Sequence, residues 1–268
     1  MLTKFLQGIN RRLNRHKLLI AKYSSPETVF IYQMGKVGST TLEKSLPNAV
    51  HVHAFYSKNH SCPVRLQGLA KFGLKHFIYR AEQEIVDYLL RRAFKQRKHI
   101  KVITLVRQPM RRNISMFFHD LDAYLFAAHT NCLNSRNAPL PTRLQSNSIL
   151  LDVFDCEFDH NYALNWFDIE FLPMTGVDVY KHPFDTDQGY GLIKERKVEV
   201  LCLRTDKLSG NVDVLSDFLG KEVEIISVNK ADDKWYGEVY QKFVQAYSPS
   251  FARELKMKQS KFVKHFFS

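Results

Sequence analysis

Short apolar runs alternate with longer segments of helical periodicity along most of the chain. The runs are rich in Val and Ile, as expected of buried parallel strands, and they comprise residues 29–33, 49–53, 76–79, 100–106, 198–203 and 224–228. Helical patterns cover residues 39–45, 81–97, 110–126 and 213–219. This alternation predicts an α/β protein, a three-layer sandwich with a mostly parallel central sheet and helices on both faces. Residues 127–190 are the least regular and are expected to supply a lid or an acceptor site.

The two ends of the chain differ from the rest in charge. Residues 1–22 contain six Lys or Arg residues and no acid, and their apolar residues recur at helical spacing. The sequence thus predicts a basic amphipathic segment over residues 1–27, an α/β domain over 28–247, and a basic C-terminal helix over 248–268 that belongs to the same domain. Each terminal segment fits either contact with anionic lipid or ordinary docking with a solvated basic face.

Composition limits the class of protein. The chain has 268 residues, 45% of them hydrophobic, and a net charge of +12. Such a charge favours an anionic partner, which leaves nucleic acid, membrane, acidic polysaccharide and phosphorylated cofactor open. Four scattered cysteines, no apolar run of about 18 residues and no signal-peptide core predict a cytoplasmic protein. Peripheral contact with the inner face of the membrane is an open option.

A glycine-containing loop follows the first predicted strand. Residues 33–42 read QMGKVGSTTL, in which Gly35 and Gly38 allow a tight turn and close approach of a ligand. Ser39, Thr40 and Thr41 then open a helix whose free N–H groups suit an anion. Lys36 lies between the glycines, whereas a triphosphate loop needs its lysine directly after the last glycine. We therefore expect a phosphate cradle of the P-loop type that works without a metal ion.

A second phosphate motif follows the strand at 100–106. Arg107 would leave this strand at its carboxyl end, beside the cradle, and Pro109 would begin a helix. Ser115 would lie about two turns into that helix. An arginine and a hydroxyl group together make a good site for a second phosphate.

These two motifs resemble those of sulfotransferases that use 3′-phosphoadenosine 5′-phosphosulfate. The resemblance implies that the 5′-phosphosulfate is held by Gly35, Lys36, Val37, Gly38, Ser39, Thr40 and Thr41. It also implies that Arg107 and Ser115 hold the 3′-phosphate. Residues 200–208 resemble a later strand of this family, which usually ends in Tyr-Glu-Asp-Leu. Here Thr205 and Asp206 stand in place of the first two residues of that ending.

Residues 229–236, NKADDKWY, resemble the Asn…Lys-Trp-Tyr signature of the bacterial capsular polysaccharide synthesis branch of this superfamily. That branch implies a saccharide acceptor, such as a capsular or other cell-surface polysaccharide, and no specific nucleic-acid partner. Tyr236 and its neighbour Trp235 fit either stacking on a ligand or anchoring a C-terminal helix.

Sulfuryl transfer requires a general base and stabilisation of charge. Lys36 can supply the charge. His53, near the end of the strand at 49–53, is the expected base, and His51, His119 and Asp120 remain alternatives. Two other functions stay open: a P-loop nucleotide kinase, and a non-enzymatic basic module that binds nucleic acid or membrane.

Overall fold

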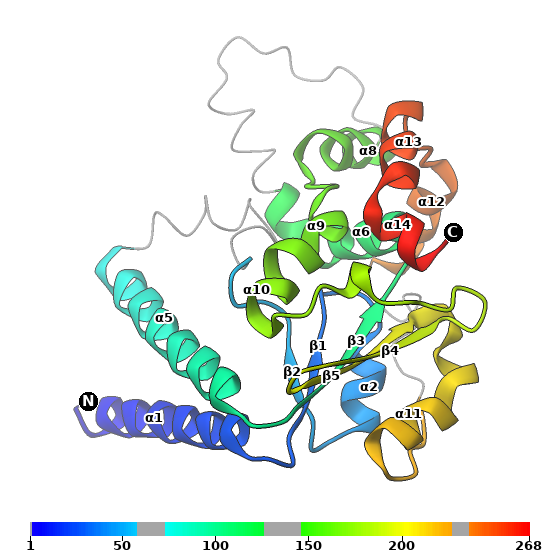
Figure 1. The fold of residues 1–268 in the computed structure, drawn as a ribbon. Coiled ribbons are helices and arrows are strands. Elements are labelled where there is room, and N and C mark those ends of the chain that lie inside the picture. Colours follow the sequence, from blue (N-terminus) through cyan, green and yellow to red (C-terminus); the bar gives the residue numbers. More distant parts are fainter. Residues whose placement is uncertain (1, 58–72, 126–145, 227–235) are drawn as a thin grey trace.

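The computed structural model describes residues 2–57, 73–125, 146–226 and 236–268 (Figure 1). At its centre is a five-stranded sheet with the strand order β2-β1-β3-β5-β4. The strands are β1 Val29–Tyr32, β2 Val50–Val52, β3 Ile100–Val106, β4 Tyr190–Glu195 and β5 Val198–Arg204. All neighbours are parallel except β4 and β5. The predicted α/β class with a mostly parallel sheet is confirmed.

Four of the six predicted strands are confirmed. The strand predicted at 76–79 is wrong, and the strand predicted at 224–228 is wrong for the residues that the structure describes. Residues 76–79 lie inside the 24-residue helix α5, Gly73–Gln96, because a short apolar run cannot be distinguished from one turn of a long helix. Residues 224–226 form no strand, and 227–228 lie outside the described residues. The strand β4 was missed. It forms a hairpin with β5 through Arg196, whose φ is +53°.

The remaining elements are helical. The α-helices besides α5 are α1 Leu2–Ser24, α2 Ser39–Ser45, α6 Pro109–His119, α8 Ser146–Glu157, α9 Tyr162–Trp166, α10 Leu172–Thr175, α11 Val212–Leu219, α12 Gly237–Ala246, α13 Phe251–Gln259 and α14 Lys261–Phe266. A π-helix, η1 Phe167–Phe171, joins α9 to α10, and two 3₁₀ segments are η2 Val179–Lys181 and η3 Thr205–Asn211. The predicted C-terminal helix is thus two helices, broken at Ser260.

Helices cover both faces of the sheet. On one face, Phe30 of β1 contacts the ring of Phe94 in α5, and Tyr32 contacts Phe171 in η1. Lys101 of β3 pairs with Val29, so its side chain points to the opposite face. There its Nζ atom donates a hydrogen bond to the carbonyl of Phe218 in α11. The sheet therefore lies between two helical layers.

A second aromatic core lies beside the sheet, between α6, α8 and α12. Phe117 of α6 contacts Phe154 of α8 at 5.1 Å between ring centroids, and Phe118 contacts Phe243 of α12 at 5.2 Å. Tyr236 is buried and its ring lies 5.6 Å from Phe118. Of its two sequence-based interpretations, the structure matches the anchoring one, whereas Trp235 lies outside the described residues.

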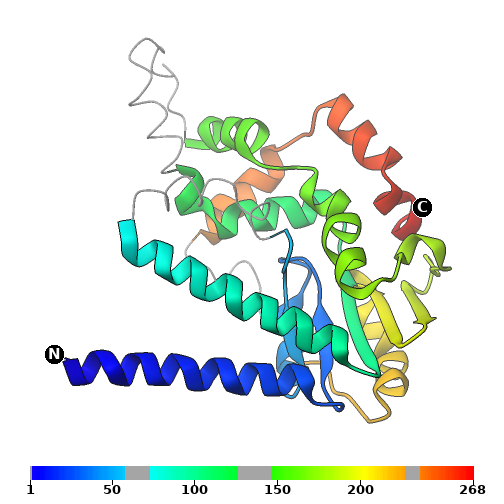
Figure 2. The same ribbon diagram turned by 60° about the vertical axis from the view of Figure 1, so that its left-hand side comes forward.

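The helices α1 and α5 project from the body as a two-helix arm (Figures 1 and 2). Arg97, just beyond α5, is buried at the root of the arm. Its guanidinium group donates hydrogen bonds to the carbonyls of Tyr23, Ser25, Pro26 and Thr28 at the end of α1. A buried cation that is fully hydrogen-bonded in this way fixes α1 to α5. Among the described residues, no helix combines the length and apolar character needed to cross a membrane.

A buried carboxylate joins η1 to the loop after β2. Glu170 has no exposed surface, and it accepts hydrogen bonds from the Tyr32 hydroxyl and from the N–H groups of Phe55, Tyr56 and Ser57. Burial, and then the adjacent carboxylate, raise the pKa of Tyr32 well above its ordinary value. Four donors on one carboxylate fix the loop that follows His53.

Replacing this carboxylate by an amide should destabilise the protein. The variant Glu170→Gln loses the charge and presents an NH₂ group to donors, which should cost roughly 2–4 kcal/mol of unfolding free energy. Chemical denaturation of the wild type, Glu170→Gln and the exposed control Glu84→Gln measures the effect. Equal stability of all three proteins would contradict this account of Glu170.

Candidate functional site

The carboxyl ends of four strands meet at one edge of the sheet. Because β1 lies between β2 and β3, the loop after β1 is flanked by the residues that leave the other two strands. His53 follows β2, Arg107 follows β3, and Thr205 follows β5. The parallel arrangement therefore gathers the predicted chemistry around the cradle.

The loop between β1 and α2 has two left-handed residues. Lys36 has a φ of +70° and Gly38 a φ of +97°. Alternation of this kind turns backbone N–H groups toward one side, where they form an anion-binding concavity. The helix α2 has only seven residues, so its dipole is small. The loop itself and nearby cations must therefore carry most of the attraction for an anion.

Three successive carbonyls of this loop are held by side chains. The Gly35 carbonyl accepts from Nε of Arg112 at 3.0 Å, and the Lys36 carbonyl accepts from Nη1 of Arg107 at 3.1 Å. The Val37 carbonyl accepts from the Thr205 hydroxyl. These donors come from α6, from the end of β3 and from the end of β5. Three separate elements of the fold thus fix the backbone of this loop.

Thr205 also explains why glycine occupies position 38. A Cβ atom on Gly38 would lie 2.9 Å from Cγ2 of Thr205, and the positive φ adds strain. The Thr205 hydroxyl also contacts the carbonyl of Val106 at 3.0 Å, which ties β3 and β5 to the cradle. The residue that departs from the resembled family pattern is therefore a support of the loop.

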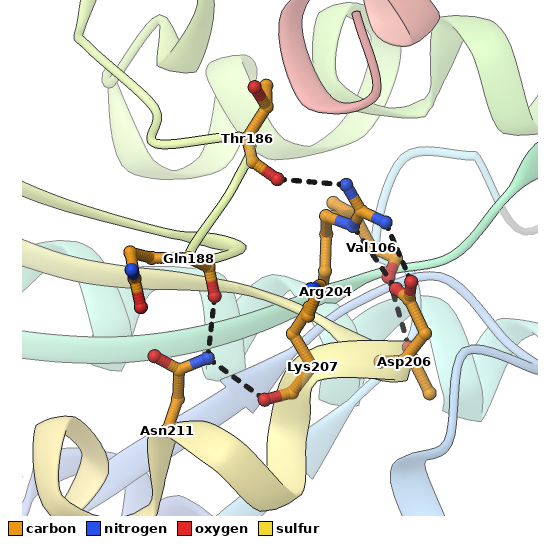
Figure 3. A network of polar contacts seen from close by, with 8 residues as sticks. Val106, Thr186, Gln188, Arg204, Asp206, Lys207 and Asn211 are labelled. Carbon is orange, nitrogen blue, oxygen red and sulfur yellow. Dashed lines mark hydrogen bonds and ion pairs between the residues drawn. The ribbon is translucent and has the colours of Figure 1, made fainter.

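A polar network continues from Thr205 along the end of β5 (Figure 3). Arg204 forms an ion pair with Asp206 at 2.7 Å and donates to the Thr186 carbonyl at 3.1 Å. Its hydrogen bond to Asp206 is the main cause that lowers the pKa of that carboxyl. Asn211 donates to the carbonyls of Gln188 and Lys207. The turn before β4 is thus fastened to η3, immediately behind the cradle.

Arg112 and its neighbour Arg111 were both open from the sequence as a phosphate contact, one of them being expected to be solvated, and the structure buries Arg112 and exposes Arg111. The Arg112 side chain has an exposed fraction of 1%, and it stacks over the ring of Tyr162 at 5.1 Å. Burial lowers the pKa of its guanidinium to about 10, so the group stays protonated at neutral pH. Its Nη2 atom has no hydrogen-bond partner among the described residues. Helical spacing from Pro109 could have shown that Arg112 faces inward while Arg111 faces solvent.

A cavity of about 450 Å³ lies beside the cradle. Its lining comprises Gly35, Lys36, Thr40, Glu43, His51, His53, Ala54, Arg112, Met116, His119 and Tyr162. Four of the predicted site residues therefore line one cavity: Gly35, Lys36, Thr40 and His53. Val37 has no exposed surface and packs in the core. Arg107 contacts the cradle from outside the cavity lining, and neither Thr41 nor Ser115 belongs to that lining.

His51 of β2 and His53, directly after the strand, line this cavity from the same side, as their spacing predicts. Their ring centroids lie 4.2 Å apart. Burial, and then the charge of His53, lower the pKa of His51 to about 4, and its Nδ1 atom lies 3.6 Å from Glu43. At neutral pH His51 is therefore uncharged.

The ring of His53 has a defined tautomer. Its Nδ1 atom lies 3.2 Å from the carbonyl of Gln33, which can only accept, so Nδ1 carries the proton. The Nε2 atom is then the basic nitrogen. Desolvation is the largest cause that lowers the pKa of His53; the Gln33 carbonyl and Glu43 oppose it, while Arg112 and Lys36 reinforce it. The neutral imidazole that a general base requires is thus the favoured form.

Comparison with known proteins covers the C-terminal part of the chain. Residues 144–268 match the family model NKWYS, described as putative capsular polysaccharide synthesis protein. The match agrees with the branch that residues 229–236 indicate. It does not reach the cradle, Arg107 or Ser115. No curated protein and no solved structure matches the chain.

The NKWYS-matched region contributes to the cavity and its supports. It supplies Tyr162 in the cavity wall, Glu170 behind the loop after His53, and Thr205 under the cradle. The part of the chain before residue 144 supplies the cradle and both histidines. The two parts of the chain therefore complete one site.

The conflict between Gly38 and Thr205 gives a direct test of the cradle. We expect Gly38→Ala to lower stability by about 1–2 kcal/mol through backbone strain alone, with a further loss from the clash. Thr205→Ser removes Cγ2 but keeps the hydroxyl, so the double variant should recover the clash component and keep the backbone component. Chemical denaturation of the wild type, the two single variants and the double variant measures the backbone component and the clash component of the lost stability.

The control for this cycle is Gly210→Ala, where an added Cβ meets nothing within 4 Å. If Thr205→Ser and Gly38→Ala are simply additive, the close packing of these two residues does not determine the shape of the loop.

Proposed function

We propose that this protein is a sulfotransferase that moves a sulfuryl group from 3′-phosphoadenosine 5′-phosphosulfate to a hydroxyl group of a saccharide. The observation that carries the proposal is the fixed loop of residues 35–38, whose carbonyls are held by Arg107, Arg112 and Thr205 beside a neutral histidine. The capsular polysaccharide family of residues 144–268 supports a glycan acceptor, and the net positive charge fits an anionic donor.

In this proposal the cradle binds the phosphosulfate end of the donor. Backbone N–H groups of the loop, Lys36 and Arg112 stabilise charge on the sulfuryl group and the departing phosphate. The unpartnered Nη2 atom of Arg112 gains an anionic acceptor, which accounts for an otherwise costly buried donor. Arg107 uses one N–H group on the Lys36 carbonyl and offers others to the 3′-phosphate, with Ser115 as its expected partner.

His53 acts as the general base. Its Nε2 atom removes the proton from the acceptor hydroxyl while the acceptor oxygen bonds to sulfur. The bond from sulfur to the 5′-phosphate oxygen breaks, and 3′,5′-phosphoadenosine leaves with both electrons of that bond. Sulfuryl transfer requires no further proton donor, since the leaving phosphate is a weak base. Glu43 and His51 adjust the charge around His53 from the same wall of the cavity.

Binding of the product nucleotide tests the donor site. We expect 3′,5′-phosphoadenosine to raise the melting temperature of the wild type. Lys36→Ala and Arg107→Ala should each weaken the affinity by roughly 10- to 100-fold, the value of one charge-assisted hydrogen bond. The exposed neighbours provide matched controls, since Lys44→Ala and Arg111→Ala should bind as the wild type does.

Two results would overturn this assignment. One is a wild type that does not respond to 3′,5′-phosphoadenosine. The other is a response only to ATP with magnesium, which would indicate the nucleotide kinase. Transfer of labelled sulfate from the donor into a panel of acidic and neutral glycans then identifies the acceptor.

The pH dependence of transfer tests His53. Its pKa lies below the ordinary 6.5, so the base form persists as pH falls and the acid limb of kcat/KM should lie below pH 6.5. Glu43→Gln removes a negative charge that favours the imidazolium, so the limb should move to lower pH. His53→Gln should reduce the rate by about 10²- to 10⁴-fold and abolish the limb. A limb that Glu43→Gln leaves in place would assign the titration to another group.

A further inference from the structure

The outer face of α5 is apolar although it faces solvent. Ile85 is 62% exposed, Tyr88 57% and Leu89 37%. Their spacing places them together on one side of the helix, between the exposed Glu84 one turn before Tyr88 and the exposed Arg92 one turn after it. The opposite side carries Val86, Leu90, Ala93 and Phe94, which are buried in the core. A helix that is apolar on both sides buries its second side against something else.

The other helix of the arm is strongly basic. The helix α1 contains six Lys or Arg residues and no Asp or Glu. It packs against α5, and Arg12 pairs with Glu82 at 3.2 Å. The exposed Leu18, with an exposed fraction of 69%, lies on one side of α1 among Arg11, Arg15 and Lys22. The arm thus combines bulky apolar side chains with a dense positive field.

We infer that the α1–α5 arm docks on the surface of an anionic phospholipid bilayer. Apolar side chains that enter the headgroup region, surrounded by Lys and Arg, are what an interfacial helix presents to such a surface. A second copy of the same arm would bring two positive surfaces together, which opposes symmetrical pairing. Nucleic acid would use the positive charge but would leave Ile85 and Leu89 in water.

The shape of the molecule agrees with this placement. The arm projects from one end of the body, whereas α13 and α14 lie at the other end (Figures 1 and 2). Phe262 and Phe266 of α14 have no exposed surface, so this helix uses its apolar face inside the core, whereas α13 leaves Phe251 exposed. One planar surface can therefore contact the arm without involving the C-terminal helices.

The arm is also joined to the candidate site. Arg91 of α5 donates to the Phe55 carbonyl at 3.3 Å, and Lys95 donates to the hydroxyl of Tyr56 at 3.1 Å. Both partners belong to the loop that Glu170 holds directly after His53. A bilayer bound to α5 would thus contact the same helix that holds the loop after His53 through Arg91 and Lys95. This inference does not depend on the chemistry of the proposed transfer.

Vesicle co-sedimentation of the full chain tests the inference. We expect binding to vesicles that contain phosphatidylglycerol, weak binding to pure phosphatidylcholine, and a decrease at high salt. The double variant Ile85→Gln/Leu89→Gln should lose binding by roughly tenfold or more while its circular dichroism and melting temperature stay unchanged. The control Leu192→Gln changes an exposed leucine of β4 and should bind as the wild type does.

Several outcomes would overturn the inference. They are equal binding to both kinds of vesicle, absence of binding to either, and full binding by the Ile85→Gln/Leu89→Gln variant. Sedimentation velocity that shows a wild-type dimer and a monomeric variant would assign the face to a second copy. Duplex DNA that competes fully with vesicles and binds the variant normally would assign the basic surface to nucleic acid.

Discussion

The rest of the site depends on three hydrogen bonds, which side chains of Arg112, Arg107 and Thr205 donate to successive carbonyls of the cradle. Lys36 has a left-handed backbone conformation, which residues with an L side chain rarely adopt, and Gly38 is left-handed as well. Donors from α6, β3 and β5 hold this backbone in place before any ligand arrives. The N–H groups of a loop that is already fixed lose little entropy when they bind an anion. Preorganisation of this kind favours both affinity and catalysis. The site is therefore a property of the sheet edge and not of the loop alone.

Glu170 applies the same kind of constraint next to His53, the proposed general base. It belongs to the π-helix η1, a rare form in which one turn is widened, and such turns often accompany functional sites. From there its carboxylate reaches Tyr32 and three consecutive N–H groups after β2. Residues 144–268, which match the capsular polysaccharide family model, thus position a loop encoded more than a hundred residues earlier, and both parts of the chain line the cavity.

The sequence predicted the parts of the site that local patterns encode. Buried strands, the glycines of the cradle and the alternation of His51 and His53 all have short-range signatures, and the sheet edge brought them together. The helix over 76–79 escaped prediction because only its full length of 24 residues distinguishes it from a strand. The roles of Arg112, Glu170 and Thr205 escaped because they depend on contacts between distant segments. The partners of Glu170 lie 113 to 138 positions away.

Charge links the two proposals and also separates them. In the cavity wall, Arg112 is a buried cation that points in a fixed direction. It stays protonated in spite of its lowered pKa, and its stacking on Tyr162 replaces part of the lost hydration. Along α1 the cations are numerous and solvated, so salt screens them. In the proposed donor site, the first arrangement would select one anionic group by geometry, whereas in the inferred docking the second would respond to the average charge of a surface. Under the two proposals, the positive charge of the sequence thus serves two physically different kinds of recognition.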